Sequence, residues 1–112
     1  DKAYKQKPTR PSIQNEAKNG LKNDLGTVAM ARTSAPHSAS SQFFINGKNN
    51  DFLNAANAQD GWGYTVFGKV VSGMDVVTRI SKAPTGSGGP FPTDAPKEMV
   101  IIESVTLVAD KK

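Results

Sequence analysis

The sequence contains no cysteine and a single histidine, His37. The absence of cysteine excludes disulfide frameworks, thiolate metal sites and cysteine nucleophiles. One histidine cannot build a multi-histidine metal centre, and Asp24, Asp51 and Asp60 are too scattered to suggest a carboxylate cage. We therefore expect no metal and no cofactor. A chain without cysteine is typical of a reducing compartment, so we expect a cytoplasmic location, with the periplasm as the open alternative.

Long apolar runs are also absent, as is a charge excess over the whole chain. No segment approaches the roughly 20 apolar residues that cross a bilayer, so we expect no membrane span. The net charge of +4 lies within residues 1–22, and the remaining sequence is balanced. This arm is broken by Pro8 and Pro11 and has only Tyr4 as an aromatic residue. We interpret it as a solvated loop and expect no nucleic-acid partner; salt-dependent binding of DNA or RNA would reveal one.

What is present is the pattern of a small β domain. The 112 residues suffice for one domain. Period-2 alternation and glycine-bounded turns predict strands over residues 27–31, 42–46, 64–71 and 99–108, a helix over about 74–81 and a loop over 83–98. About four to five strands and one short helix leave sheet edges unpaired. The predicted fold class is therefore mainly β, and the chain is expected to be part of an antiparallel barrel.

Alternation also assigns faces within residues 42–46. Gln42 and Phe44 lie on one face of the predicted strand, and Phe43 lies on the other. We expect Phe43 to enter the core and Phe44 to stay available to a ligand. In the loop that follows, we expect Trp62 to pack rather than to bind.

The central part of the sequence carries a specific set of motifs. Met-Ala at residues 30–31 is followed by a loop of small residues and then by Ser-Gln-Phe-Phe-Ile at 41–45. Gly-Trp-Gly-Tyr occupies 61–64, and Val-Phe-Gly-Lys-Val-Val-Ser-Gly-Met occupies 66–74. In order and spacing these motifs resemble those of the cyclophilins, the peptidyl-prolyl cis/trans isomerases, and Gly-Trp-Gly-Tyr looks like the bacterial branch. The resemblance covers about residues 11–108.

The resemblance implies an eight-stranded antiparallel barrel closed by two helices. We expect residues 1–112 to form a single cyclophilin-like domain that corresponds to the C-terminal two-thirds of this barrel, without its N-terminal strands and first helix. The first part of the family's sequence carries a Phe-His-Arg motif whose arginine is the main catalytic residue. The arginines of this chain are Arg10, Arg32 and Arg79, and none lies in such a motif.

The function implied by the resemblance is the cis/trans isomerisation of X–Pro bonds in folding proteins, without a cofactor. Gln42 would have a supporting catalytic role. The residues that the resemblance assigns to substrate binding are Ala31, Arg32, Thr33, Gln42, Phe44, Phe52, Leu53 and Tyr64. The implied partners are proline-containing peptides, unfolded client proteins and cyclic peptides of the cyclosporin type. The complete protein is expected to be a monomer.

The residue types in this set fit the chemistry of the reaction. Rotation about an X–Pro bond breaks amide resonance and crosses a barrier of about 18–20 kcal/mol. A catalyst needs an apolar pocket for the ring, hydrogen bonds to the flanking backbone, and a donor toward the prolyl nitrogen. The apolar residues would form the pocket for the ring. The amide of Gln42 and the backbone of residues 31–33 would form the hydrogen bonds to the flanking backbone. The guanidinium that would donate toward the prolyl nitrogen is not in this chain.

Two alternatives to an isomerase stay open, because the catalytic arginine is not in this chain. They are a non-catalytic module that binds proline peptides and an inactive fragment. We expect residues 1–112 alone to isomerise prolyl peptides poorly, since the loss of one preorganised donor costs roughly 10²–10³ in rate. If Phe52 and Leu53 do not bind a ligand, they would only stabilise the polar loop in which they lie. We expect His37 to be a surface loop residue.

Overall fold

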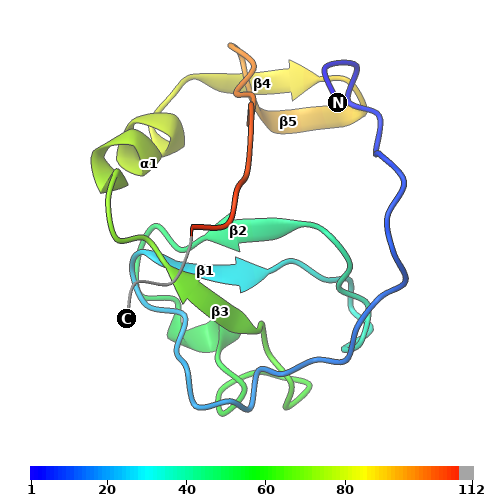
Figure 1. Cartoon of the computed structure of the whole chain (residues 1–112), viewed down its shortest axis with the longest axis vertical. Coiled ribbons are helices and arrows are strands. Elements are labelled where there is room, and N and C mark those ends of the chain that lie inside the picture. The colour runs from blue at the N-terminus through cyan, green and yellow to red at the C-terminus, as the bar shows by residue number, and fades with distance from the viewer. Residues whose placement is uncertain (109–112) are drawn as a thin grey trace. The chain divides into compact units, whose positions relative to one another are not determined.

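The computed structural model describes residues 1–108, and Figure 1 shows their course. The chain divides into two compact units. The central unit is Pro8–Ser81, and the terminal unit combines Asp1–Lys7 with the described residues from Lys82 onward. The central unit holds a three-stranded sheet and a helix, and the terminal unit holds a two-stranded sheet. The mainly β class is therefore confirmed, and the described residues form open antiparallel sheets rather than a closed barrel.

Three short strands form the sheet of the central unit. They are β1 (Thr27–Met30), β2 (Phe43–Ile45) and β3 (Val66–Lys69), in the order β2-β1-β3, with both neighbouring pairs antiparallel. The strands predicted over 27–31, 42–46 and 64–71 are confirmed with shorter ends. β1 starts directly after Gly26, whose φ of +85° favours glycine and turns the chain into the strand.

The two faces of this sheet differ in burial. Ala29 lies opposite both Phe44 and Val66, so these three side chains share a face, on which Ala29 and Val66 are buried. Met30 lies opposite Phe43 on the other face. Phe43 is 47% exposed, so the prediction that it enters the core is wrong. Alternation separates two faces correctly, but the element that packs on a face decides whether it is buried.

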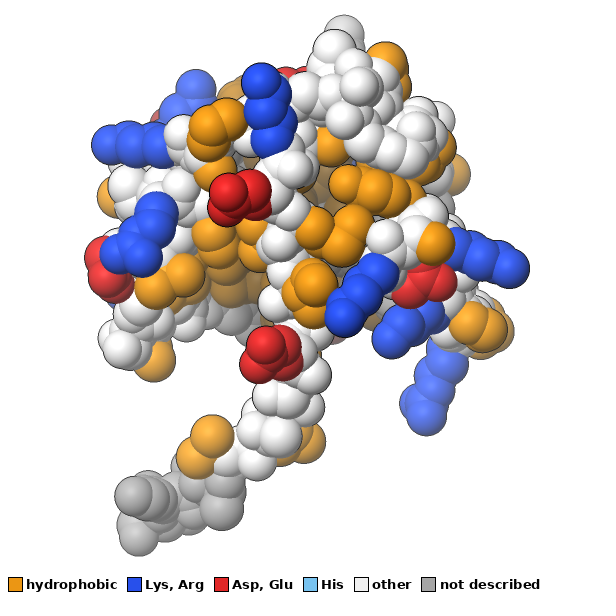
Figure 2. All heavy atoms as spheres, turned by 90° about the horizontal axis from the view of Figure 1, so that it is seen from above, with side chains coloured by type: hydrophobic (Ala, Val, Ile, Leu, Met, Phe, Trp, Pro, Cys, Tyr) orange, Lys and Arg blue, Asp and Glu red, His pale blue; other side chains and the backbone are white. Residues whose placement is uncertain are grey.

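β3 contains an irregularity opposite β1. Val28 pairs with Gly68 and Ala29 pairs with Val66, which leaves Phe67 as an extra residue on β3. A bulge of this kind changes the direction of a side chain and increases the local twist. Phe67 is exposed. Other large hydrophobic side chains are exposed as well, and Figure 2 shows hydrophobic side chains at the surface of the face that it draws.

The helix α1 (Met74–Ser81) ends the central unit and confirms the helix predicted at about 74–81. Gly73 precedes it with a φ of +88°, and its carbonyl accepts hydrogen bonds from the next turn. Asp75 lies in the first turn and Arg79 in the last, which matches the helix dipole at both ends. No helix among the described residues is long and apolar enough to cross a membrane.

The terminal unit is built on a hairpin of β4 (Thr85–Gly88) and β5 (Phe91–Pro96). The prediction of a loop over 83–98 is therefore wrong. Among residues 1–108 each of these strands pairs only with the other, so the prolines of β5 lie on an edge, where a missing N–H is tolerated. The ring of Tyr4 contacts Phe91 edge-on at a centroid distance of 6.1 Å, which adds the first residues of the chain to this unit.

The strand predicted over residues 99–108 is also wrong. These residues have no regular secondary structure and are exposed throughout. Their alternating apolar pattern is a strong strand signal, but a strand also needs a neighbour with which to exchange backbone hydrogen bonds. No described strand supplies one.

Candidate functional site

Two predicted site residues meet next to the buried face of the central sheet. The ring of Phe44 contacts the ring of Tyr64 edge-on, with centroids 5.8 Å apart and an interplanar angle of 77°. Leu53 joins them through the backbone, because the N–H of Tyr64 donates to the carbonyl oxygen of Leu53 at 2.9 Å. All three residues are half-buried, so they combine apolar surface with access for a ligand.

Two other residues of the predicted pocket lie at more open positions. Phe52 belongs to the short 3-10 helix η1 (Asp51–Leu53) and is 67% exposed. Gln42 is exposed just before β2. None of the residues predicted for the proline pocket lines the two cavities of about 640 and 240 Å³ in the central unit, although Arg32 lines the smaller one. A single pocket formed by Phe44, Phe52, Leu53 and Tyr64 with Gln42 at its rim therefore stays a prediction.

The backbone that was expected to receive an extended peptide is partly engaged. The N–H of Ala31 donates to the carbonyl of Gln42 at 2.9 Å. The N–H of Thr33 donates to the hydroxyl of Ser38 at 2.9 Å, and the two hydroxyl groups are also bonded. Both contacts fold the loop after β1 back on itself. An added strand at residues 31–33 would thus rely on the carbonyls and on the N–H of Arg32.

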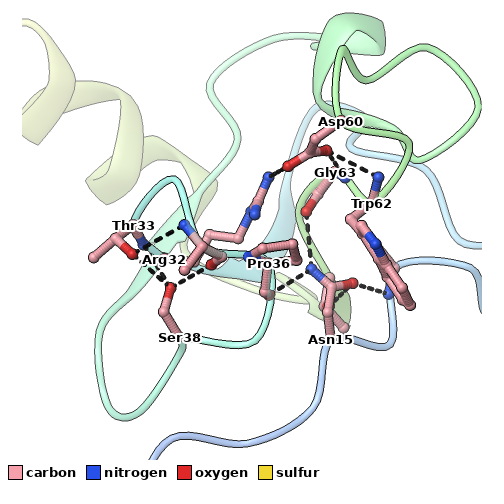
Figure 3. A network of polar contacts seen from close by, with 11 residues as sticks. Asn15, Arg32, Thr33, Pro36, Ser38, Asp60, Trp62 and Gly63 are labelled. Carbon is pink, nitrogen blue, oxygen red and sulfur yellow. Dashed lines mark hydrogen bonds and ion pairs between the residues drawn. The ribbon is translucent and has the colours of Figure 1, made fainter.

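The side chain of Arg32 runs under Tyr64 to an ion pair with Asp60. Its guanidinium carbon lies 5.1 Å from the centroid of the Tyr64 ring, and the side chain is only 7% exposed. Figure 3 shows it reaching the Asp60 carboxylate. Its Nε and Nη1 atoms are buried and have no hydrogen-bond partner among the described residues. The ring of Tyr64 therefore contacts both the ring of Phe44 and a largely desolvated cation.

Asp60 is held as a carboxylate by this arrangement. The Arg32 guanidinium and the backbone N–H of Trp62, which both donate to it, lower the pKa of Asp60 from 3.8 to about 2. The N–H of Gly63 donates to the same carboxylate at 3.3 Å. The ion pair thus also orders the turn that leads into Tyr64.

A second polar clamp ties the loop after β1 to this turn. The amide of Asn15 donates to the carbonyls of Pro36 and Gly63 at 3.2 and 3.1 Å (Figure 3). The N–H of Asn15 donates to Nδ1 of His37 at 3.0 Å. Asn15 is buried, so each of these contacts replaces a lost contact with water.

Trp62 packs on the outside of this clamp. Its ring lies 4.7 Å from the ring of His37 and 4.2 Å from the ammonium nitrogen of Lys18. These contacts agree with the expectation that Trp62 packs, and His37 is exposed as expected of a surface loop residue. Among residues 1–108, no three His, Asp or Glu side chains are grouped closely enough to hold a metal ion.

Sequence reasoning missed the asparagines that support the site. Asn23, Asn46 and Asn54 are buried and bonded to one another in series. The sequence shows many asparagines in this region, but asparagine is also the ordinary residue of exposed turns. Composition therefore gave no signal that separates a buried amide network from solvated loops.

Gly63 is the second missed residue. It has a φ of +65°, and a Cβ atom there would lie 2.5 Å from the carbonyl oxygen of Leu53 and 2.7 Å from the nitrogen of Ala55. Both neighbours are backbone atoms, which cannot move aside as a flexible side chain does. Only glycine lets the turn before Tyr64 approach the end of η1 this closely.

Comparisons with known proteins show the family to which the sequence belongs. The model of the family "Cyclophilin type peptidyl-prolyl cis-trans isomerase/CLD" matches residues 1–107. The chain is 61% identical over 104 residues to peptidyl-prolyl cis-trans isomerase B of Escherichia coli (strain K12), covering 92% of the chain and 63% of that protein. It is 54% identical over 104 residues to peptidyl-prolyl cis-trans isomerase cyp18 of Streptomyces antibioticus, covering 92% of the chain and 62% of that relative.

A third relative, a peptidyl-prolyl cis-trans isomerase of Acinetobacter baylyi (strain ATCC 33305 / BD413 / ADP1), is 53% identical over 103 residues. This match covers 92% of the chain and 53% of the relative. The chain thus spans between 53% and 63% of the length of these three relatives.

Proposed function

Because the chain belongs to the cyclophilin type peptidyl-prolyl cis-trans isomerase family, we propose that its protein catalyses the cis/trans isomerisation of X–Pro peptide bonds. The observation that carries the proposal is the edge contact of Phe44 with Tyr64 beside Leu53, since it offers a half-buried apolar surface that a proline ring could contact. The names of the relatives, all peptidyl-prolyl cis-trans isomerases, support the same activity.

The proposed mechanism requires binding of the proline ring and stabilisation of the twisted amide. Phe44, Leu53 and Tyr64 would bind the ring, and Phe52 would extend this surface where η1 is exposed. The Gln42 amide would hold a substrate carbonyl during rotation. These contacts lower the barrier only to the extent that they are stronger in the twisted state than in the planar one.

We further propose that the clients are unfolded proteins with accessible X–Pro segments. An exposed apolar surface suits extended chains, whereas the tertiary context of an ordered loop in a folded protein normally locks one X–Pro isomer. Cyclic peptides of the cyclosporin type are proposed as ligands of the same surface. We also propose that the complete protein is a monomer, as the family resemblance implies. We propose a cytoplasmic location because the sequence contains no cysteine.

An exchange measurement tests the proposal. A short X–Pro peptide is mixed with the chain, its affinity is measured by titration, and its cis/trans exchange rate is measured by NMR. We expect binding and an exchange that is only weakly accelerated, because the guanidinium donor toward the prolyl nitrogen is not in this chain. The Phe44→Ala variant is expected to bind about tenfold more weakly, because it removes the aromatic wall next to Tyr64.

The adjacent Phe43→Ala variant is the matched control, since Phe43 lies on the opposite face of β2. It is expected to change affinity and exchange by less than about twofold. Binding without accelerated exchange would point to a proline-binding module and contradict the proposed isomerase activity. Equal effects of the two variants would contradict the assignment of Phe44 to the site.

A further inference from the structure

We propose that Asn23 is a positioning residue of the candidate site, which holds Leu53 and Tyr64 at their mutual spacing. The inference rests on the proposed function, because it concerns the same prolyl-peptide surface. Asn23 lies in the segment that leads into β1, far in sequence from both residues that it holds.

The contacts of the Asn23 amide carry the proposal. Its Nδ2 donates to the carbonyl oxygen of Leu53 at 3.3 Å and to the carbonyl oxygen of Tyr64 at 3.1 Å. A third acceptor, Oδ1 of Asn54, lies 3.1 Å from the same nitrogen, so its hydrogens are shared among three acceptors. One buried amino group thus bridges the backbone of both site residues.

The backbone and the side-chain oxygen of Asn23 are also held by hydrogen bonds. Its own N–H donates to Oδ1 of Asn54 at 2.7 Å, and its carbonyl accepts from the N–H of Asn50 at 2.8 Å. Its Oδ1 accepts from Nδ2 of Asn46 at 3.0 Å. Rotating the amide would place an oxygen against the carbonyls of Leu53 and Tyr64, so the surrounding groups define a single orientation.

Burial makes this residue hard to replace. The side chain of Asn23 is 0% exposed, and water cannot take over its contacts without a rearrangement. The Leu53 carbonyl also accepts from the N–H of Tyr64 and would keep that bond if Asn23 were removed. The Tyr64 carbonyl would lose the Asn23 donor. We therefore expect the backbone at Tyr64 to shift and to change the contact of its ring with Phe44.

Asn46 offers a matched control. It is the same residue type, is 1% exposed, and belongs to the same network. Its Nδ2 donates to Oδ1 of Asn23 and to the hydroxyl of Thr27, and its Oδ1 accepts from Asn50. None of these contacts reaches Leu53 or Tyr64. An Asn46→Ala variant therefore removes a buried amide of the network without removing the bridge.

The experiment compares Asn23→Ala, Asn46→Ala and the unchanged chain at a temperature at which all are folded. Two quantities are measured: the NMR signals of Leu53, Phe44 and Tyr64 without ligand, and the affinity for a short X–Pro peptide. We expect Asn23→Ala to move the three signals and to weaken binding about tenfold, whereas Asn46→Ala changes binding less than about twofold. Asn23→Thr, which keeps one donor, replaces Asn23→Ala if the latter does not fold.

The outcomes separate this proposal from the proposed function. If the unchanged chain binds no prolyl peptide but only the Asn23 variant moves the signals of Leu53 and Tyr64, the proposed function fails and the positioning role stands. If Asn23 and Asn46 variants affect signals and binding alike, the network acts only on stability and the positioning role is overturned. Unmoved signals in the Asn23 variant overturn it as well.

Discussion

The two faces of the sheet β2-β1-β3 are built from similar residues but behave differently. On one face Ala29 and Val66 are buried, and Phe44 contacts Tyr64. On the other face Phe43 and the bulged Phe67 are exposed. The apolar content of the strands is therefore not what distinguishes the face that carries the candidate site.

The difference lies in the polar support beside the buried face. Asn23 bridges the carbonyls of Leu53 and Tyr64, and Asn15 and Asp60 hold the turn at Gly63. Buried amides that are fully bonded specify one arrangement, because every alternative leaves a polar group unpaired. The apolar surface formed by Phe44, Leu53 and Tyr64 is thus positioned by hydrogen bonds as well as by packing.

The largest effect is expected at Gly63. Gly63→Ala adds a Cβ atom against the backbone of Leu53 and Ala55, and we expect it to lower the free energy of unfolding by roughly 3–5 kcal/mol. Gly61→Ala is the control, since Gly61 also has a positive φ but a Cβ there meets nothing within 4 Å. It should cost about 1–2 kcal/mol. Urea unfolding measures both, and equal losses would contradict the close approach at Gly63.

A smaller loss of stability is expected when side chains are truncated on the two faces of the sheet. Val66→Ala removes buried apolar volume and should cost about 2 kcal/mol. The neighbouring Phe67→Ala removes a larger but exposed side chain and should cost less than about 1 kcal/mol. Thermal or urea unfolding compares the two variants. A greater loss for Phe67→Ala would show that the exposed face is covered in solution.

The smallest effect concerns the ion pair of Asp60 with Arg32. Since folding lowers the pKa of Asp60 to about 2, its contribution to stability is complete above its ordinary pKa of 3.8 and disappears as the pH falls through about 2. Asp60→Asn should therefore be less stable than the unchanged chain at pH 5, and this difference should largely vanish below pH 2. Unfolding measured across this range tests it, and a difference that does not change with pH would contradict the ion pair.

Much of the central unit was predictable from the sequence. The glycine before Thr27, the alternation at residues 42–46 and the spacing of Met74, Val77 and Ile80 act locally, so each element follows from its own segment. Phe44 and Tyr64 could also be nominated from the sequence, through the motifs around them. Their edge contact is a tertiary observation that the motifs alone do not give.

Other features depend on partners that no local pattern reveals. Phe43 is exposed because no element packs closely on its face among the described residues. Residues 99–108 are unpaired because no described strand lies beside them. The role of Asn23 depends on carbonyls about thirty or more residues away along the chain. Long-range pairing of this kind cannot be inferred from spacing, because the loops that permit it have no fixed length.

We propose that proline peptides bind to the face with Phe44, Leu53 and Tyr64 and not to the opposite face. The most direct test of this proposal is an NMR titration of the chain with a short X–Pro peptide, in which the signals of both faces are followed together. We expect the largest shifts at Phe44, Leu53 and Tyr64, and signals of Phe43 and Phe67 that stay nearly unchanged. Larger shifts at Phe43 and Phe67 would contradict it.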